Sequence, residues 1–225
     1  MPITPDSKIV CIFFDDAYLN QYEAALPILL ENNFRATFGI ITDHVGGGYD
    51  LMEYMSAGQM EELAAYGMDI ASHTKTHAHL RTLTDEQLRE ELFDSKQTLE
   101  DMGFTVSTMV YPYYEWDDRV VEYTINAGYL CARGGWNQDR VYDRTTTNAK
   151  ARYSVSAWQI SNQNLDAFKV IVDQASSTNV VSLVYHFISD TGPEDTSTTI
   201  ANFKAQMAYL KSAGYTVVCL PDLFK

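Results

Sequence analysis

The feature that most constrains this chain of 225 residues is a repeated alternation between short apolar runs and amphipathic stretches. The apolar runs predict buried strands, and the stretches between them place apolar side chains on one helical face. We expect strands over Lys8–Phe14, Ala36–Ile41, Met68–Ser72, Ser107–Tyr111, Tyr129–Ala132, Arg152–Ser156, Val180–His186 and Tyr215–Leu220. We expect helices over Asn20–Glu31, Ser56–Tyr66, Thr84–Asp101, Asp117–Asn126, Leu165–Ala175 and Thr198–Ala213.

This alternation predicts an α/β fold, because consecutive parallel strands need a helical crossover between them. About eight strands in this length favour a distorted (β/α) barrel of seven or eight parallel strands, with residues 1–225 forming a single domain. A doubly wound sheet is the alternative. Both architectures place functional residues at the carboxyl ends of the strands, so the residues after each apolar run are the candidates for a site.

Composition excludes several classes of protein. The net charge is −14, which argues against nucleic acid and anionic membranes as partners, and 46% hydrophobic residues suffice for a core. No apolar run reaches the ~20 residues of a membrane span. The opening MPITPDSK has no leader, so we expect either a secreted or cell-surface protein whose leader is absent from this sequence, or a cytoplasmic one. Cys11, Cys131 and Cys219 are expected to be buried free thiols.

Two strands end in groups that suit a metal. Asp15 and Asp16 follow the first apolar run, where a cation would relieve the cost of two neighbouring buried carboxylates, although such a pair can also cap a helix. His73 and His77 follow the third run, and on a helical turn imidazoles four residues apart face one way. That arrangement suits two ligands of one divalent metal.

The other strand ends carry candidates for catalysis and substrate binding. Pro112 and Tyr113 predict a rigid turn, Arg133 ends the fifth run before two glycines and Trp136, and His186 closes the seventh. An aromatic ring such as Trp136 can line a sugar pocket, and a histidine that faces a site is a natural general acid. Each residue could equally be structural. Together with the acidic pair and the two histidines they predict a metal hydrolase.

These motifs resemble the polysaccharide deacetylase family, also known as the NodB-homology domain or carbohydrate esterase family 4. The resemblance rests on Phe14-Asp15-Asp16, on Ser72 to His77, on Tyr111-Pro112-Tyr113 and on Val184-Tyr185-His186, and it extends over nearly the whole chain.

The resemblance implies a role for each matching residue. Asp16, His73 and His77 would bind a divalent metal, zinc in most relatives, with cobalt or nickel tolerated. Asp15 would be the general base and His186 the general acid. The backbone amide of Tyr113 would stabilise the oxyanion, and Pro112, Tyr113 and Trp136 would contact the substrate.

Two departures from the family pattern affect these expectations. Val110 stands where many relatives have an arginine that orients the catalytic aspartate, and we expect Arg133 to take that role. The aspartate that usually tunes the last histidine has no clear match.

The expected function is therefore deacetylation of a polysaccharide. We expect the protein to be a monomer. The expected substrate is an N-acetylglucosamine polymer such as chitin, peptidoglycan or poly-N-acetylglucosamine. O-deacetylation of acetylxylan, a catalytically weak glycan-binding module, and hydrolysis of a small non-sugar amide are the alternatives.

Overall fold

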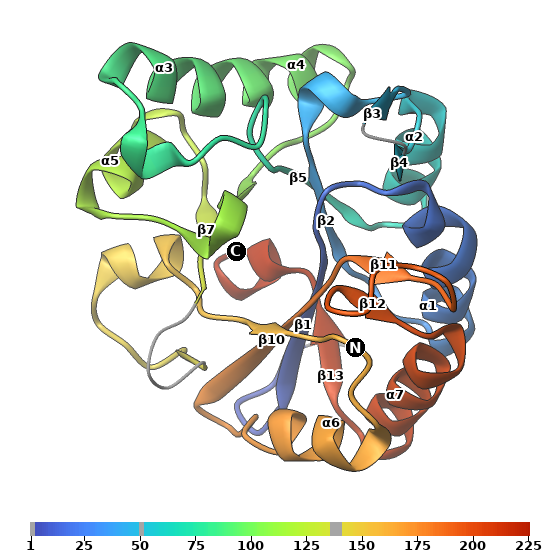
Figure 1. The fold of residues 1–225 in the computed structure, drawn as a ribbon. Coiled ribbons are helices and arrows are strands. Elements are labelled where there is room, and N and C mark those ends of the chain that lie inside the picture. The colour runs from blue at the N-terminus through green and yellow to red at the C-terminus, as the bar shows by residue number, and fades with distance from the viewer. Residues whose placement is uncertain (1–2, 50–51, 136–140) are drawn as a thin grey trace.

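A nine-stranded sheet runs through the molecule, with β1 (Ile9–Phe14) near its middle (Figure 1). The computed structural model describes residues 3–49, 52–135 and 141–225. The strand order is β7-β6-β5-β2-β1-β10-β8, with β13 also paired to β1 and β9 to β10. The other strands of this sheet are β2 (Thr37–Ile40), β5 (Asp69–Ser72), β6 (Thr108–Val110), β7 (Cys131–Arg133), β8 (Tyr142–Asp143), β9 (Trp158–Gln159), β10 (Asn179–Tyr185) and β13 (Thr216–Val218).

The sheet curls, and its pairing shows how. The first half of β1 pairs with β13 and its last two residues pair with β2, so β1 divides between two neighbours. On the far side, a bridge between Arg133 and Val155 joins β7 to the segment that continues into β9. The predicted α/β fold with a distorted barrel is confirmed, with one difference: β8 pairs antiparallel to β10.

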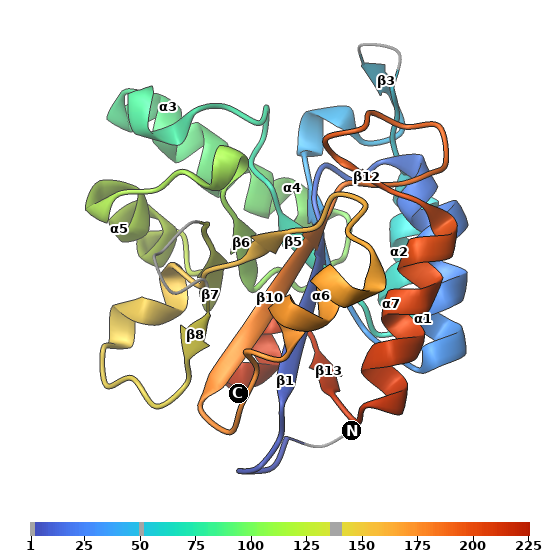
Figure 2. The ribbon, with the colours of Figure 1, turned by 60° about the horizontal axis from the view of Figure 1, so that its bottom comes forward.

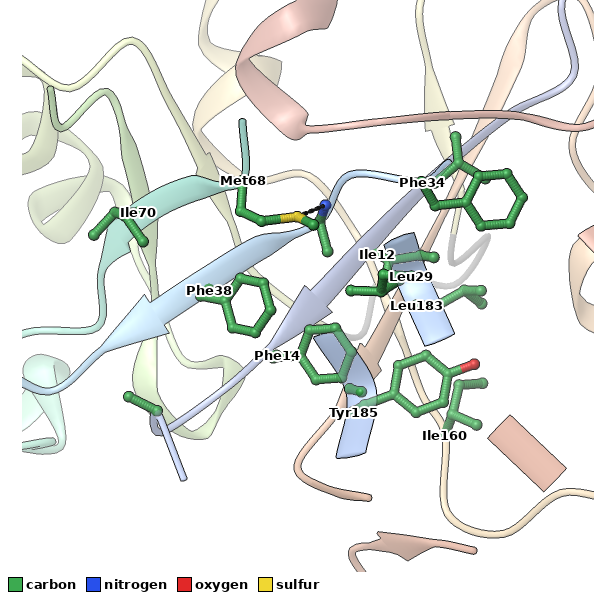
Figure 3. Close-up of a cluster of buried hydrophobic side chains, with 14 of the residues drawn as sticks. Ile12, Phe14, Leu29, Phe34, Phe38, Met68, Ile70, Ile160, Leu183 and Tyr185 are labelled. Atoms are coloured by element: carbon green, nitrogen blue, oxygen red, sulfur yellow. Dashed lines mark hydrogen bonds between the residues drawn. The ribbon is translucent and has the colours of Figure 1, made fainter. Parts of the chain in front are cut away.

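The alternation of side chains along β1 explains why this strand is apolar throughout. Ile9, Cys11 and Phe13 lie in a cluster inside the curled sheet, while the residues between them face the covering helices. On that outer face the ring of Phe14 stacks on Phe38 at 4.8 Å and on Tyr185 at 5.7 Å (Figure 3). A strand buried on both faces needs apolar side chains at every position.

Helices surround the curled sheet (Figures 1 and 2). They are α1 (Leu26–Asn32), α2 (Ala57–Ala65), α3 (Asp85–Arg89), α4 (Ser95–Asp101), α5 (Asp118–Asn126), α6 (Leu165–Val172) and α7 (Ile200–Ser212). Helices α1 and α7 lie side by side in both views. The short strands β3 (Gly48–Tyr49) with β4 (Met52–Glu53), and β11 (Phe187–Ile188) with β12 (Ser197–Thr198), form two further small sheets.

Two expected helices contain a π turn. Gln21–Ala25 is a π turn leading into α1, and Glu90–Asp94 is a π turn between α3 and α4. π turns often occur at functional sites. A capping box formed by Thr84 and Gln87 begins the long helix.

The expected strand over Arg152–Ser156 is wrong. Ala149–Tyr153 forms a 3₁₀ turn, begun by the Asn148 side chain, which accepts a hydrogen bond from the Lys150 amide. Within that range Val155 alone pairs with the sheet. The prediction of buried free cysteines is confirmed for all three. In the described part of the chain, no helix combines the length and apolarity that crossing a bilayer requires.

Candidate active site

Asp15 and Asp16 occupy the carboxyl end of β1 and are both buried. The Asp15 amide donates to the carbonyl of Tyr185, so sheet pairing continues one residue past the strand. The chain then turns sharply, because Asp16 and Ala17 have φ angles of 75° and 63°. Aspartate tolerates this left-handed conformation better than most residues. The turn directs the two adjacent carboxylates to different neighbours.

His73 and His77 lie in a loop, which we call the histidine loop (residues 73–77), and the helical turn expected there is wrong. Thr74 and His77 have φ angles of 68° and 63°, and the hydroxyl of Thr74 accepts a hydrogen bond from the His77 amide. Left-handed residues replace the helical turn in bringing the imidazoles together, with ring centroids 4.7 Å apart.

The two imidazoles converge on Asp16. Nε2 of His73 and Nε2 of His77 each lie 3.4 Å from Oδ1 of Asp16, and one possible ligand atom from each residue lies within 4.8 Å of the other two. Nδ1 of His73 lies 2.7 Å from the carbonyl of Val110, which can only accept a hydrogen bond. His73 therefore carries its proton on Nδ1 and directs Nε2 toward Asp16 and His77.

The electrostatics of these three groups suit a cation. Burial and the neighbouring His73 lower the pKa of His77 to about 4, so its imidazole is neutral at pH 7. Burial opposes the ionisation of Asp16, but the close contact with His73 outweighs burial and holds the pKa of Asp16 well below its usual range. A neutral imidazole and an ionised carboxylate are the forms that bind a divalent metal.

Asp15 is held by Arg133, and its Oδ2 also lies 3.9 Å from Nε2 of His73 in the histidine loop. One guanidinium nitrogen of the fully buried Arg133 donates to Oδ2 of Asp15. The guanidinium also lies 4.7 Å from the ring centroid of Tyr114 and 5.8 Å from that of Phe13. Oδ1 of Asp15 is buried and has no hydrogen-bond partner among the described residues. Arg133 thus holds one oxygen of the carboxylate and leaves the other available.

His186 approaches the same carboxylate from β10. Its Nε2 lies 3.9 Å from Oδ2 of Asp15. Its Nδ1 is buried and has no hydrogen-bond partner in the described part of the chain. This agrees with the absence of a recognisable aspartate partner in the sequence.

The turn at Tyr111–Tyr114 forms a wall beside the histidines. Pro112 is buried, whereas Tyr113 is 46% exposed and its ring centroid lies 4.6 Å from that of His77. The exposed His79 stacks on the same tyrosine at 3.8 Å. A pocket of about 440 Å³ opens beside this wall, lined by Asp43, His44, Thr76, His77 and Tyr113. Trp136, the other expected substrate contact, lies outside the described residues.

Comparison with known proteins agrees with this geometry. The family model described as "Polysaccharide deacetylase" matches residues 3–132. The chain belongs to the polysaccharide deacetylase family. YxkH of Bacillus subtilis, named as a candidate polysaccharide deacetylase, is 33% identical over 126 residues, or 56% of this chain and 44% of YxkH. This chain therefore spans less than half the length of that relative.

Two further proteins cover almost the whole chain. A peptidoglycan-N-acetylglucosamine deacetylase of Bacillus cereus is 25% identical over 98% of this chain and 90% of its own length. The crystal structure of a Bacillus anthracis protein, described as a carbohydrate esterase family 4 pseudoenzyme, superposes with a TM-score of 0.66 at 16% identity, covering 99% of this chain and 67% of that one. The second likeness concerns the fold alone.

Two buried polar residues beside the candidate site are missing from the sequence predictions. Nε2 of Gln21 donates to the carbonyls of Asp15, at 2.5 Å, and His186, at 2.8 Å, and so joins the ends of β1 and β10. Glu91 accepts hydrogen bonds from the histidine loop. Both residues belong to π turns. Neither residue forms a motif with its sequence neighbours, so only their contacts in the folded structure identify them.

The residues present fit a divalent metal. Two imidazole nitrogens and one carboxylate oxygen converge, one imidazole has its tautomer fixed by a backbone carbonyl, and a free carboxylate oxygen lies nearby. Three protein ligands with an open position are typical of catalytic zinc sites.

Proposed function

We propose that this chain is a metal-dependent deacetylase that hydrolyses N-acetyl groups of an N-acetylglucosamine polymer. The observation that carries the proposal is the convergence of Asp16, His73 and His77 next to an acid and a base, Asp15 and His186, at one edge of the sheet. The family membership and the Bacillus cereus relative support it. Since such polymers lie outside the cytoplasm, we also propose that the protein is secreted or acts at the cell surface.

In this proposal Asp16, His73 and His77 hold the metal. A divalent cation there would lower the pKa of a water molecule toward neutrality and polarise the acetyl carbonyl. Zinc suits two nitrogen ligands and one oxygen ligand, and cobalt or nickel would be tolerated.

Asp15 accepts the proton that leaves the attacking water. Its Oδ2 is held by Arg133, so Oδ1 is the oxygen available for the proton. Arg133 keeps the carboxylate in one orientation, which makes it a positioning residue for the base. Asp15 and Arg133 are both buried, which strengthens the interaction between their charges.

His186 then donates a proton from Nε2 to the leaving nitrogen. This atom lies 3.9 Å from Oδ2 of Asp15, so the acid and the base are close enough to act on the same amide group. We assign the oxyanion contact to the backbone amide of Tyr113, whose φ of 54° sets the turn apart from ordinary 3₁₀ geometry. An oxyanion donor contributes roughly 3–4 kcal/mol to transition-state stabilisation.

The exposed side of the site fits a sugar ring. The Tyr113 ring and the pocket beside it offer an aromatic wall and polar groups from Asp43, His44 and Thr76. The net charge of −14 favours neutral or partly deacetylated, cationic glycans over anionic ones.

A test measures acetate release from chitooligosaccharides, peptidoglycan, acetylxylan and a small acetyl ester, with Asp15→Asn as the matched inactive variant. Release from the first two substrates that is lost in the variant supports the proposal. Release from acetylxylan alone would assign O-deacetylation instead. No release from any substrate by the metal-loaded protein would indicate a glycan-binding module, an outcome that the lack of a described partner for Nδ1 of His186 makes worth testing.

A further inference from the structure

The histidine loop cannot hold its shape by itself. It is neither helix nor strand, and two of its five residues are in the left-handed region. For a β-branched residue such as Thr74 this conformation is an outlier, and such a conformation persists only where surrounding groups fix it. The positions of both imidazoles therefore depend on contacts from outside the loop.

The carbonyl side of the loop is fixed by the 3₁₀ turn Thr42–His44, which follows β2. The amides of Thr42 and Asp43 donate to the carbonyls of Thr74 and Lys75, at 3.2 and 3.0 Å. This leaves the amide side of the loop in need of an acceptor.

Glu91 provides that acceptor. Its Oε2 accepts from the amides of Lys75 and Thr76, both at 2.9 Å, and its Oε1 accepts from the hydroxyl of Thr76 at 2.5 Å. Glu91 itself is only 7% exposed, so its carboxylate is largely buried, while its partner Thr76 lies at the surface. A carboxylate that accepts three hydrogen bonds makes stronger bonds than a neutral acceptor would.

The π turn brings this carboxylate to the loop and is itself tied to the strand that precedes the loop. The hydroxyl of Ser95 donates to the Glu91 carbonyl at 2.6 Å and lies 2.8 Å from the hydroxyl of Ser72. The Ser72 hydroxyl in turn accepts from the Thr74 amide at 3.2 Å. Ser95 thus links the π turn that carries Glu91 to Ser72, at the end of β5, and through Ser72 to the start of the histidine loop.

We propose that Glu91 is a positioning residue for the metal site, which presets His73 and His77 and thereby raises affinity for a divalent metal. The inference rests on the metal site of the proposed function. The Glu91 carboxylate hydrogen-bonds to Lys75 and Thr76, which lie between the two histidines, so its effect passes through the loop backbone. Loss of an outer partner of metal ligands typically weakens binding 10–100-fold.

The test measures the Kd of zinc and of cobalt by competition with a chromophoric chelator, together with the visible spectrum of the cobalt form. In Glu91→Gln one oxygen becomes an NH₂ group that faces donors, so we expect 10–100-fold weaker binding and an altered cobalt spectrum. Glu90→Gln, at an exposed position of the same π turn, is the matched control and should bind as the wild type does. Thr76→Val removes the hydroxyl bond alone and should weaken binding a few-fold.

Wild-type affinity and spectrum in a folded Glu91→Gln would overturn the inference. If that variant fails to fold, Thr76→Val decides, and unchanged binding there overturns the inference as well. Failure of the wild type to bind zinc or cobalt would be a different result, because it removes the proposed function itself along with the role assigned to Glu91.

Discussion

At the scale of single residues, the buried pair of Asp15 and Arg133 shows how the site tolerates charge in its interior. Each group compensates the other, and the guanidinium also lies against the rings of Phe13 and Tyr114. Removing one partner of such a pair leaves an uncompensated buried charge, which costs far more than the pair itself contributes. A test of Arg133 should therefore keep its charge.

We predict that Arg133→Lys lowers kcat/KM on the order of 10²-fold, because an ammonium group lacks the planar fork that orients the Asp15 carboxylate. Metal affinity should stay unchanged, since Arg133 contacts none of the three candidate ligands. Steady-state acetate release and the chelator competition measure the two effects. Arg152→Lys makes the same change at a residue that lies over the ring of Phe224, and it should be silent. Equal kcat/KM in Arg133→Lys and the wild type would show that Arg133 does not position the catalytic base.

At the scale of elements, the two glycines after β7 are explained by the aromatic rings that pack on them. A Cβ atom on Gly135 would lie 2.2 Å from Cβ of Tyr114, and one on Gly134 would lie 2.5 Å from Nε1 of Trp116. These contacts leave no space for a side chain. Gly135 thus allows Tyr114 to pack close to β7, where its ring lies against the guanidinium of Arg133.

Gly135→Ala should therefore destabilise the protein by about 2 kcal/mol, as overpacking does, and should lower activity by displacing Tyr114 from Arg133. Gly58→Ala, in α2 where nothing lies within 4 Å, should be stabilising by about 0.5–1 kcal/mol. Urea unfolding of both variants measures the difference. An unchanged free energy of unfolding in Gly135→Ala would show that Tyr114 can move to make room for the added methyl group.

Asp69 in β5 lies between Thr37 of β2 and Thr108 of β6. The titration of this carboxyl group makes a pH-dependent contribution to stability. Burial raises the pKa of Asp69 to about 6, although the hydroxyls of Thr108 and Thr37 donate to its Oδ2. Since the folded-state pKa exceeds the ordinary value near 3.9, the folded protein binds this proton more tightly than the unfolded chain. The contribution is complete below about pH 4 and is lost as pH rises through about 6.

Asp69→Asn should remove that dependence. The amide oxygen can still accept from both threonines, so the variant should gain about 1 kcal/mol over the wild type between pH 4.5 and 7.5, allowing for partial exposure. Thermal unfolding across that range measures it, with the exposed Asp6→Asn as control. A stability difference that stays constant with pH would contradict the assignment.

Over the whole molecule, the sequence predicts the sheet and the candidate site residues at the strand ends. It does not predict the buried residues and the loop geometry that hold those residues in place. Periodicity and strand ends are local signals, and they identify the curled sheet, Asp15, Asp16, His73, His77 and His186. Gln21 and Glu91 escape prediction because their partners lie on other elements, 165 residues away in the case of His186 and Gln21. The loop geometry of residues 73–77 escapes it because tertiary contacts, rather than helical hydrogen bonds, set its left-handed residues.

We propose that a metal held by Asp16, His73 and His77 enables this fold to hydrolyse an acetyl amide. The most direct measurement strips the protein with a chelator, adds back one equivalent of zinc, and follows acetate release from a chitooligosaccharide in the wild type and in His77→Ala. We predict that release stops on stripping, returns with zinc in the wild type, and does not return in the variant. Release that persists after complete stripping, or that zinc restores equally in His77→Ala, would show that hydrolysis does not depend on a metal held by these three residues.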